Sequence, residues 1–173
     1  MRIPSFFLAL LFLLLPLQAW AETDLRALLE APCAKYGVPV SLALAIARHE
    51  SGEKPWAVNI AGKSVHIAGK RYSPDSKEAA LALLESRGKG KSYDVGFMQV
   101  NVQWLRRLKI SPSTAIEPVN NAWLGVWILA HAIREHGLNW KAVGVYHSPT
   151  PARQKRYIVA INRQYRKILQ EQQ

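Results

Sequence analysis

One carboxylate stands where the sequence otherwise places apolar side chains. Glu50 follows Leu42 and Ile46 at four-residue intervals, in a segment that predicts a helix capped by Ser41. Residues four apart share one face of a helix, so Glu50 belongs to the apolar stripe at its last turn. Removal from water favours the protonated form of a carboxyl group, which can then donate a proton near neutral pH. The alternative is a side chain that turns into solvent at the helix end.

A second acid, Asp94, is a further candidate for chemistry. It lies in the segment 92–101, where apolar residues flank it on both sides. Gly96, two residues later, allows the backbone to approach a ligand closely. The alternative is an aspartate that caps its own backbone in a turn.

The elements that must position these acids are mostly helical. Apolar periodicity and capping residues predict helices over 23–30, 41–51, 76–84, 104–108, 118–136, 139–146 and 151–170. Gly52 is expected to end the helix that carries Glu50, and Pro32 to end the first one. Turn signals within 56–72 predict a small irregular hairpin. The expected class is therefore α+β, predominantly α-helical, in one domain without repeats.

The charge balance points to a polyanionic partner. The 173 residues include 23 Lys and Arg against 12 Asp and Glu, a formal charge of +11. Nucleic acid, anionic lipid and acidic cell-wall polymer would each suit this surplus. Cys33 has no partner cysteine, which excludes an intramolecular disulfide and a thiolate zinc site.

Residues 1–21 predict a secretory signal peptide. Arg2 is followed by an apolar run over 6–17 and by the small-x-small sequence at 19–21. The run is shorter than the roughly 20 residues of a spanning helix, and Pro16 interrupts its end, which disfavours a membrane anchor. Removal of Arg2 with this segment leaves residues 22–173 with a charge of +10. We therefore expect an exported, periplasmic or envelope-associated domain that meets no nucleic acid and spans no membrane.

Histidine spacing gives no metal site. His49 and Glu50 are not followed by a second histidine four residues on, and His131 and His136 lie five apart, on different sides of a helix. We expect neither a metal nor another cofactor.

Several short blocks, in order, resemble the motifs of the soluble lytic transglycosylase family over residues 38–165. The blocks are Glu50-Ser51-Gly52, residues 55–59, residues 96–101, Asn121 with Gly125 and 128–129, and residues 142–146. The chain is most similar to the small single-domain members that accompany conjugation and secretion machines, whose components are candidate partners. The resemblance implies a lysozyme-like fold and cleavage of the β-1,4 bond between N-acetylmuramic acid and N-acetylglucosamine in peptidoglycan.

The resemblance also implies roles for individual residues. Glu50 would protonate the glycosidic oxygen and then, as a base, promote closure of a 1,6-anhydro sugar, with the substrate's N-acetyl group as internal nucleophile. Ser51 would hydrogen-bond Glu50, and Tyr146 would orient Glu50 or the N-acetyl group. The expected substrate-binding residues are Phe97, Met98, Gln99 and Asn101.

Departures from the family pattern leave alternatives open. His147-Ser148-Pro149 replaces the usual Asn-Ala-Gly, and His147 is either structural or a modifier of the pH optimum. The segment 93–96 also resembles the part of animal-type lysozymes that carries their second carboxylate, so Asp94 could support hydrolysis as in a muramidase. A non-catalytic cell-wall binding module is the remaining alternative. The basic helix 151–170 is a solvated face or a contact for a membrane surface or assembly partner.

Overall fold

The computed structural model describes residues 24–61 and 69–173. The predicted signal peptide, residues 1–21, lies outside the described residues, as does the middle of the predicted hairpin. Within the described ranges, no helix is both long and apolar enough to cross a membrane.

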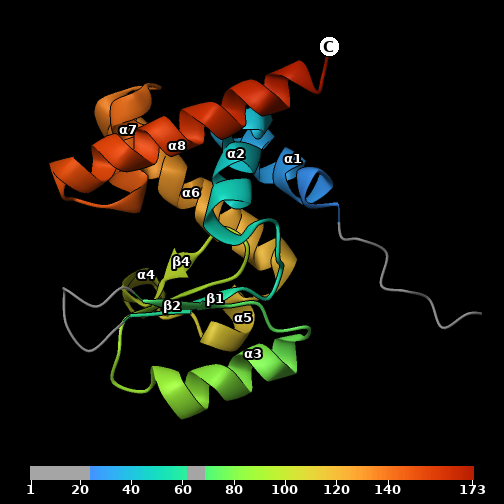
Figure 1. Ribbon diagram of the computed structural model, residues 1–173, viewed down its shortest axis with the longest axis vertical. Helices are drawn as coiled ribbons and strands as arrows, with labels where there is room; N and C mark the ends of the chain where they lie inside the picture. The colour runs from blue at the N-terminus through green and yellow to red at the C-terminus, as the bar shows by residue number, and fades with distance from the viewer. Residues whose placement is uncertain (1–23, 62–68) are drawn as a thin grey trace, which may run out of the picture.

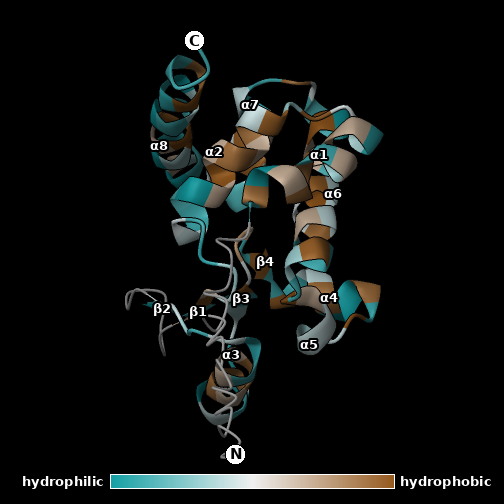
Figure 2. Ribbon diagram, turned by 90° about the vertical axis from the view of Figure 1, so that its right-hand side faces the viewer, coloured by the Kyte–Doolittle hydropathy of each residue, from teal (hydrophilic) through white to brown (hydrophobic). Residues whose placement is uncertain are grey.

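Five helices form one half of the molecule, and Figures 1 and 2 show them gathered on the same side of the sheet. They are α1 (Leu25–Tyr36), α2 (Val40–Ser51), α6 (Pro118–His136), α7 (Trp140–His147) and α8 (Pro151–Gln170). The α8 helix packs on both α2 and α7, and α6 packs on α1 and α7. The bounds of α6 and α8 confirm the predicted helices 118–136 and 151–170.

The α8 helix is bound to this half by a narrow apolar stripe. Tyr157, Ile161 and Ile168 are buried at helical spacing, whereas the remaining surface is largely basic and exposed. Each of these side chains is at most 3% exposed, so α8 closes the core above α2. A helix at the end of the described chain is therefore an integral wall of the fold.

The other half holds a four-stranded antiparallel sheet and the shorter helices (Figure 1). The strands are β1 (Val58–Ile60), β2 (Lys70–Tyr72), β3 (Tyr93–Val95) and β4 (Val100–Asn101), in the order β2-β1-β3-β4. Beside them lie α3 (Lys77–Leu83), the π-helical turn η1 (Leu84–Gly88), α4 (Val102–Leu108) and α5 (Pro112–Ala115). The pairing of β1 with β2 confirms the predicted hairpin, and the α+β class is confirmed as well.

The sheet aligns one polar row across all four strands. Arg71 pairs with Asn59, Asn59 with Asp94, and Asp94 with Asn101. In β1 the neighbours of Asn59, Val58 and Ile60, are buried, so alternation places Asn59 on the opposite face. The register therefore brings four polar residues from distant parts of the chain to one face.

Several predicted boundaries are wrong. The α1 helix does not end at Pro32 but continues to Tyr36, because Pro32 is buried with Leu29 and Cys33 against the core and Gly37 supplies the left-handed cap. The α2 helix is preceded by Pro39, so Ser41 lies inside it rather than capping it. The expected end of α2 at Gly52 is confirmed, with φ of 63°. The strands β3 and β4 and the helix α5 were not predicted.

Candidate active site

A cleft of about 720 Å³ lies between the two halves of the molecule. Its walls come from the end of α2, the polar row of the sheet, α4, α6, α7 with the following loop, and the first turn of α8. Of the residues predicted to form a site, those that line the cleft are Glu50, Asp94, Gln99, Asn101, Tyr146 and His147. The two acids, 44 positions apart in sequence numbering, therefore face one cleft from opposite halves.

Glu50 occupies the last turn of α2, and its side chain is only 12% exposed. The hydroxyl of Tyr157 donates a hydrogen bond to Glu50 Oε1 at 2.7 Å. The side chain therefore does not turn into bulk solvent at the helix end. It is held at the cleft wall by a residue of α8.

Tyr157 is itself fixed between two histidines. The ring of His147 stacks on it with centroids 4.2 Å apart and planes at 5°, and His49 meets it edge-on at 5.2 Å. Burial, together with the charge of Glu50, raises the pKa of Tyr157 well above its usual value, so its hydroxyl keeps the proton that it donates. Burial lowers the pKa of His49, which favours a neutral ring.

His147 lies within reach of the acid. Its Nδ1 is 3.7 Å from Glu50 Oε1, and its side chain is 39% exposed. The departure from the Asn-Ala-Gly pattern thus places an imidazole next to the carboxylate, stacked on the tyrosine that holds it. The stack gives His147 a packing role, and the short distance lets a charge on its ring act on Glu50.

Tyr146 reaches the cleft without holding Glu50. Its hydroxyl donates to the backbone carbonyl of Met98 at 2.8 Å. Burial raises the pKa of Tyr146 well above its usual value, so this phenol also remains a donor. Tyr146 therefore fixes the backbone that leads from β3 to β4, and Tyr157 makes the contact with the acid.

Asp94 is held at both carboxylate oxygens by its neighbours in the polar row. Asn101 Nδ2 donates to Oδ1 at 2.7 Å, and Asn59 Nδ2 donates to Oδ2 at 3.1 Å. Burial raises the pKa of Asp94, and these two hydrogen bonds partly oppose the rise. Asp94 is thus a strand residue with fixed side-chain partners, and the alternative of a turn aspartate that caps its own backbone is wrong.

A buried asparagine fixes the turn between β3 and β4. Asn121 Oδ1 accepts from the N–H of Met98 at 2.8 Å, and its Nδ2 donates to the carbonyls of Val95 and Ala115, both at 2.9 Å. Gly96 faces this amide with φ of 76°, and Gln99 closes the turn with φ of 49°. Three hydrogen bonds from one side chain of α6 therefore set the path of the turn that leads into β4.

The turn sends its two apolar side chains away from the cleft. Phe97 and Met98 are fully buried, and neither lines the cleft, so their expected role in substrate binding is wrong as a direct contact. Met98 packs against Gly125 of α6, where a Cβ atom would lie 2.5 Å from Met98 Cβ. Gln99 and Asn101, on the other side of the turn, do line the cleft.

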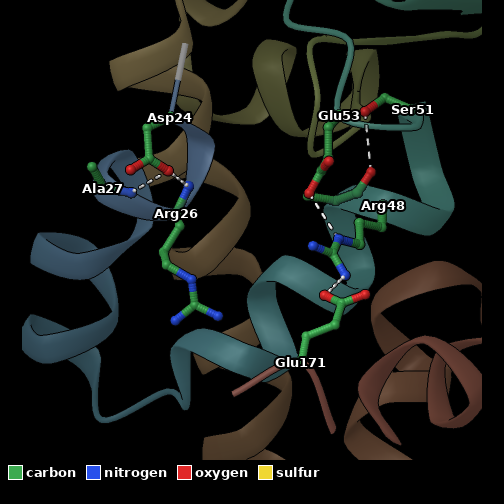
Figure 3. A network of polar contacts seen from close by, with 8 residues as sticks. Asp24, Arg26, Ala27, Arg48, Ser51, Glu53 and Glu171 are labelled. Atoms are coloured by element: carbon green, nitrogen blue, oxygen red, sulfur yellow. Dashed lines mark hydrogen bonds and ion pairs between the residues drawn. The ribbon is translucent and has the colours of Figure 1, made fainter. Parts of the chain in front are cut away.

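Ser51 does not contact Glu50 as expected. Its hydroxyl is buried and donates to the carbonyl of Ala47 at 3.1 Å, one turn back in α2. Figure 3 shows Ser51 beside the network in which Arg48 reaches Glu53 at 2.9 Å and Glu171 at 2.7 Å. Arg48 therefore ties the end of α2 to Glu171, just after α8, whereas the Ser51 hydroxyl bonds to the backbone of its own helix.

Some site residues were not predicted. Tyr157 was missed because it is distant in sequence from Glu50, although its place on the apolar stripe of 151–170 was a usable signal. Asn59 and Arg71 were missed because only the sheet register brings them to Asp94. In the described ranges, no group of three or more His, Cys, Asp or Glu side chains could hold a metal ion.

Comparisons with known proteins cover nearly the whole described chain. The family model of the transglycosylase SLT domain matches residues 28–163. Invasion protein IagB of Salmonella typhi is 28% identical over 171 residues, which cover 94% of this chain and 87% of the relative. The protein of the same name from Salmonella typhimurium strain SL1344 is similar to the same extent. No solved structure matches the chain significantly.

Proposed function

Because the chain belongs to the transglycosylase SLT family, whose members act on peptidoglycan, we propose that it is a lytic transglycosylase with Glu50 as its acid. The bond cleaved is the β-1,4 linkage between N-acetylmuramic acid and N-acetylglucosamine. The observation that carries the proposal is a carboxyl group at the cleft wall, nearly covered and fixed through one oxygen by Tyr157.

The reaction needs one proton donor and one proton acceptor in sequence. Glu50 protonates the glycosidic oxygen as the bond to the muramyl C1 breaks, and the substrate's N-acetyl oxygen attacks that carbon from within the sugar. The Glu50 carboxylate then takes the proton of the muramyl 6-hydroxyl, whose oxygen forms the 1,6-anhydro bond and displaces the N-acetyl oxygen. Glu50 ends protonated as it began, and no water is consumed.

The surrounding residues support this double use of one carboxyl group. Tyr157 occupies Oε1, which leaves Oε2 as the oxygen available for proton transfer to and from the sugar. The stack of His147 on Tyr157 keeps the phenol in place. A group held by packed neighbours transfers protons in one geometry, which is the advantage of preorganisation.

A hydrolytic muramidase is the second candidate, and Asp94 is the observation that favours it. Its carboxylate faces the same cleft and is oriented by two amides. An oriented carboxylate near the cleaved bond would stabilise the developing positive charge of the sugar while water attacks. Asp94 would then have a direct role in the chemistry rather than in binding alone.

The products of digestion test the proposal. Purified residues 22–173 should release soluble muropeptides from peptidoglycan, each lighter by one water molecule than the reducing form in mass spectrometry. Glu50→Gln should abolish release, whereas Glu53→Gln, three residues further along and outside the cleft lining, should retain it. Hydrated products that disappear in Asp94→Asn would establish the muramidase instead. If the unmodified protein binds peptidoglycan but releases nothing, the chain is a binding module.

We also propose export to the envelope and local wall remodelling around a trans-envelope machine. The leader-like sequence of residues 1–21 supports export, and similarity over most of the length of an invasion protein supports a specialised task. A fusion of residues 1–21 to a reporter that is active only outside the cytoplasm tests the first part. Loss of assembly of a secretion or conjugation apparatus in a Glu50→Gln strain tests the second.

A further inference from the structure

The α8 helix carries a row of cations on the side that faces away from the core. Its core side holds the buried residues Gln154, Tyr157, Ile161 and Ile168. On the opposite side, exposed basic residues recur at helical spacing. This basic row consists of Lys155, Arg156, Arg163, Arg166 and Lys167. Figure 2 shows α8 along the outer edge of the helical half, with hydrophilic residues over its outer side.

Acids of the protein do not neutralise the basic row. The α8 segment, residues 151–170, contains no Asp or Glu, and Glu171, the acid that follows it, is bonded to Arg48 of α2 at 2.7 Å. Among the ion pairs of the described residues, none includes a member of the row. None of the five side chains lines the cleft. Five positive charges therefore face solvent along a helix of 20 residues, about 30 Å long.

An apolar side chain lies within the basic row. Val159 is 63% exposed, more than any other large apolar side chain of the described residues. It follows Arg156 by three residues and precedes Arg163 by four, so the three share one side of the helix. Helices that lie on a membrane surface combine cations with apolar side chains that enter the boundary between headgroups and acyl chains. The aliphatic stems of Lys and Arg keep their charges at the level of the headgroups.

The composition of this face favours a lipid bilayer over other anionic partners. The exposed residues of α8 include no aromatic side chain, whereas the centres of protein–protein interfaces are rich in aromatic residues and poor in charge. A cell-wall polymer offers anionic groups but no apolar layer for Val159. Nucleic acid does not meet an exported domain. A bilayer with anionic headgroups suits both the cations and the valine.

We infer that the basic row docks the exported domain on the surface of a bilayer that contains anionic phospholipids. The α8 helix lies along this surface, with Val159 between the headgroups and the cations beside the phosphates. The inference goes beyond the proposed function, because it assigns a binding surface outside the cleft and does not depend on the chemistry of Glu50. Each Lys or Arg near an anionic bilayer strengthens binding about fivefold, and salt screens this attraction. The attachment is therefore reversible and sensitive to salt.

Co-sedimentation with lipid vesicles tests the inference. The protein is purified as residues 22–173, because the apolar run of the leader would bind lipid by itself. We expect it to bind vesicles of phosphatidylcholine and phosphatidylglycerol in equal parts, not vesicles of phosphatidylcholine alone, and to be released by high salt. Lys155→Gln, Arg163→Gln and Arg166→Gln together should weaken binding to the mixed vesicles about 100-fold. Val159→Gln, which leaves the charge unchanged, should weaken it about threefold.

A matched triple variant controls for net charge. Lys35→Gln, Lys89→Gln and Lys109→Gln together remove three exposed cations outside α8, and should weaken binding to the mixed vesicles less than about threefold because salt screens distant charges. Equal Tm values for the two triple variants and the unmodified protein establish that all three are folded.

Three outcomes overturn the inference. The first is equal binding of the two triple variants to the mixed vesicles. The second is equally tight binding of the unmodified protein to neutral vesicles. The third is a triple variant of the basic row that loses binding to isolated peptidoglycan instead of to vesicles, which would make the wall polymer its partner. Glu50→Gln should bind vesicles like the unmodified protein, so vesicle binding decides this inference even if the protein cleaves nothing and the proposed function fails.

Discussion

Substitution of Gly96 by alanine should cost far more stability than its backbone angle alone explains. A Cβ atom at Gly96 would lie 2.2 Å from Asn121 Nδ2, 2.3 Å from Cγ and 2.5 Å from Oδ1. The asparagine cannot remain where it is, because real Cβ atoms do not approach so closely. It must release its bonds to the N–H of Met98 and the carbonyls of Val95 and Ala115.

The magnitude follows from these three hydrogen bonds. Each buried backbone group left without a partner costs about 1 kcal/mol at the lower limit, and the left-handed backbone angle adds about 1 kcal/mol for a residue with a Cβ. The expected loss is therefore about 4 kcal/mol or more in the free energy of unfolding. For a domain of this size that corresponds to a fall in Tm of about 10 °C.

Gly90→Ala is the matched control. Gly90 has φ of 72°, close to the 76° of Gly96, but nothing lies within 4 Å of its added Cβ. This variant carries the backbone strain alone and should lose about 1 kcal/mol. The difference between the two variants, measured by urea unfolding, isolates the clash with Asn121.

A double-mutant cycle with Asn121→Ala completes the test. In that background the clashing atoms are gone, so adding Gly96→Ala should cost about as little as Gly90→Ala. If Gly96→Ala destabilises no more than Gly90→Ala, or if its cost is unchanged when residue 121 is alanine, the account of the turn is refuted.

Three further outcomes are expected. Tyr157→Phe keeps the stacked ring but removes the hydrogen bond to Glu50. We therefore expect kcat to fall about tenfold or more, with little change in KM or Tm. An unchanged kcat would contradict the role of Tyr157 in positioning Glu50. Burial lowers the pKa of His49 below its ordinary 6.5, so the unfolded chain binds a proton at a higher pH than the folded chain does, and the free energy of unfolding should fall as pH drops below 6.5. His49→Gln should reduce this pH dependence, measured by chemical unfolding at a series of pH values. An equal slope in both proteins would refute this account of His49. Burial raises the pKa of Cys33 to about 11. An alkylating reagent at neutral pH should therefore modify this thiol slowly in the native protein and rapidly in denaturant. Rapid labelling of the native protein would contradict the burial of Cys33.

Local sequence patterns were sufficient for most helices and for the position of Glu50. The 3.6-residue periodicity of 118–136 and 151–170 and the glycine after Ser51 reflect constraints that act within one turn of chain. Pro32 was misread because a proline is a local signal against helix, whereas the burial of that turn against the core outweighs it.

The site required information that no local pattern contains. Motif order suggested that Phe97 and Met98 would touch substrate, but positive φ at Gly96 and Gln99 turns the chain and sends both side chains into the core. The two hydrogen bonds that orient Asp94, from Asn59 and Asn101, depend on the register of β1, β3 and β4. The bond of Tyr157 to Glu50 depends on how α8 packs on α2, which is a property of the assembled core.

The separation of Glu50 from Tyr157 also sets the order in which the site can be completed. The two residues lie 107 positions apart, with α2 near the start of the described chain and α8 near its end. During synthesis the acid emerges long before the tyrosine that holds it and the histidine stacked on that tyrosine. A partly made chain that lacks α8 therefore has the acid without the tyrosine that holds it, and the geometry around Glu50 arises only when α8 has docked. The proposed active site is therefore completed only after α8 has been made and has packed on α2.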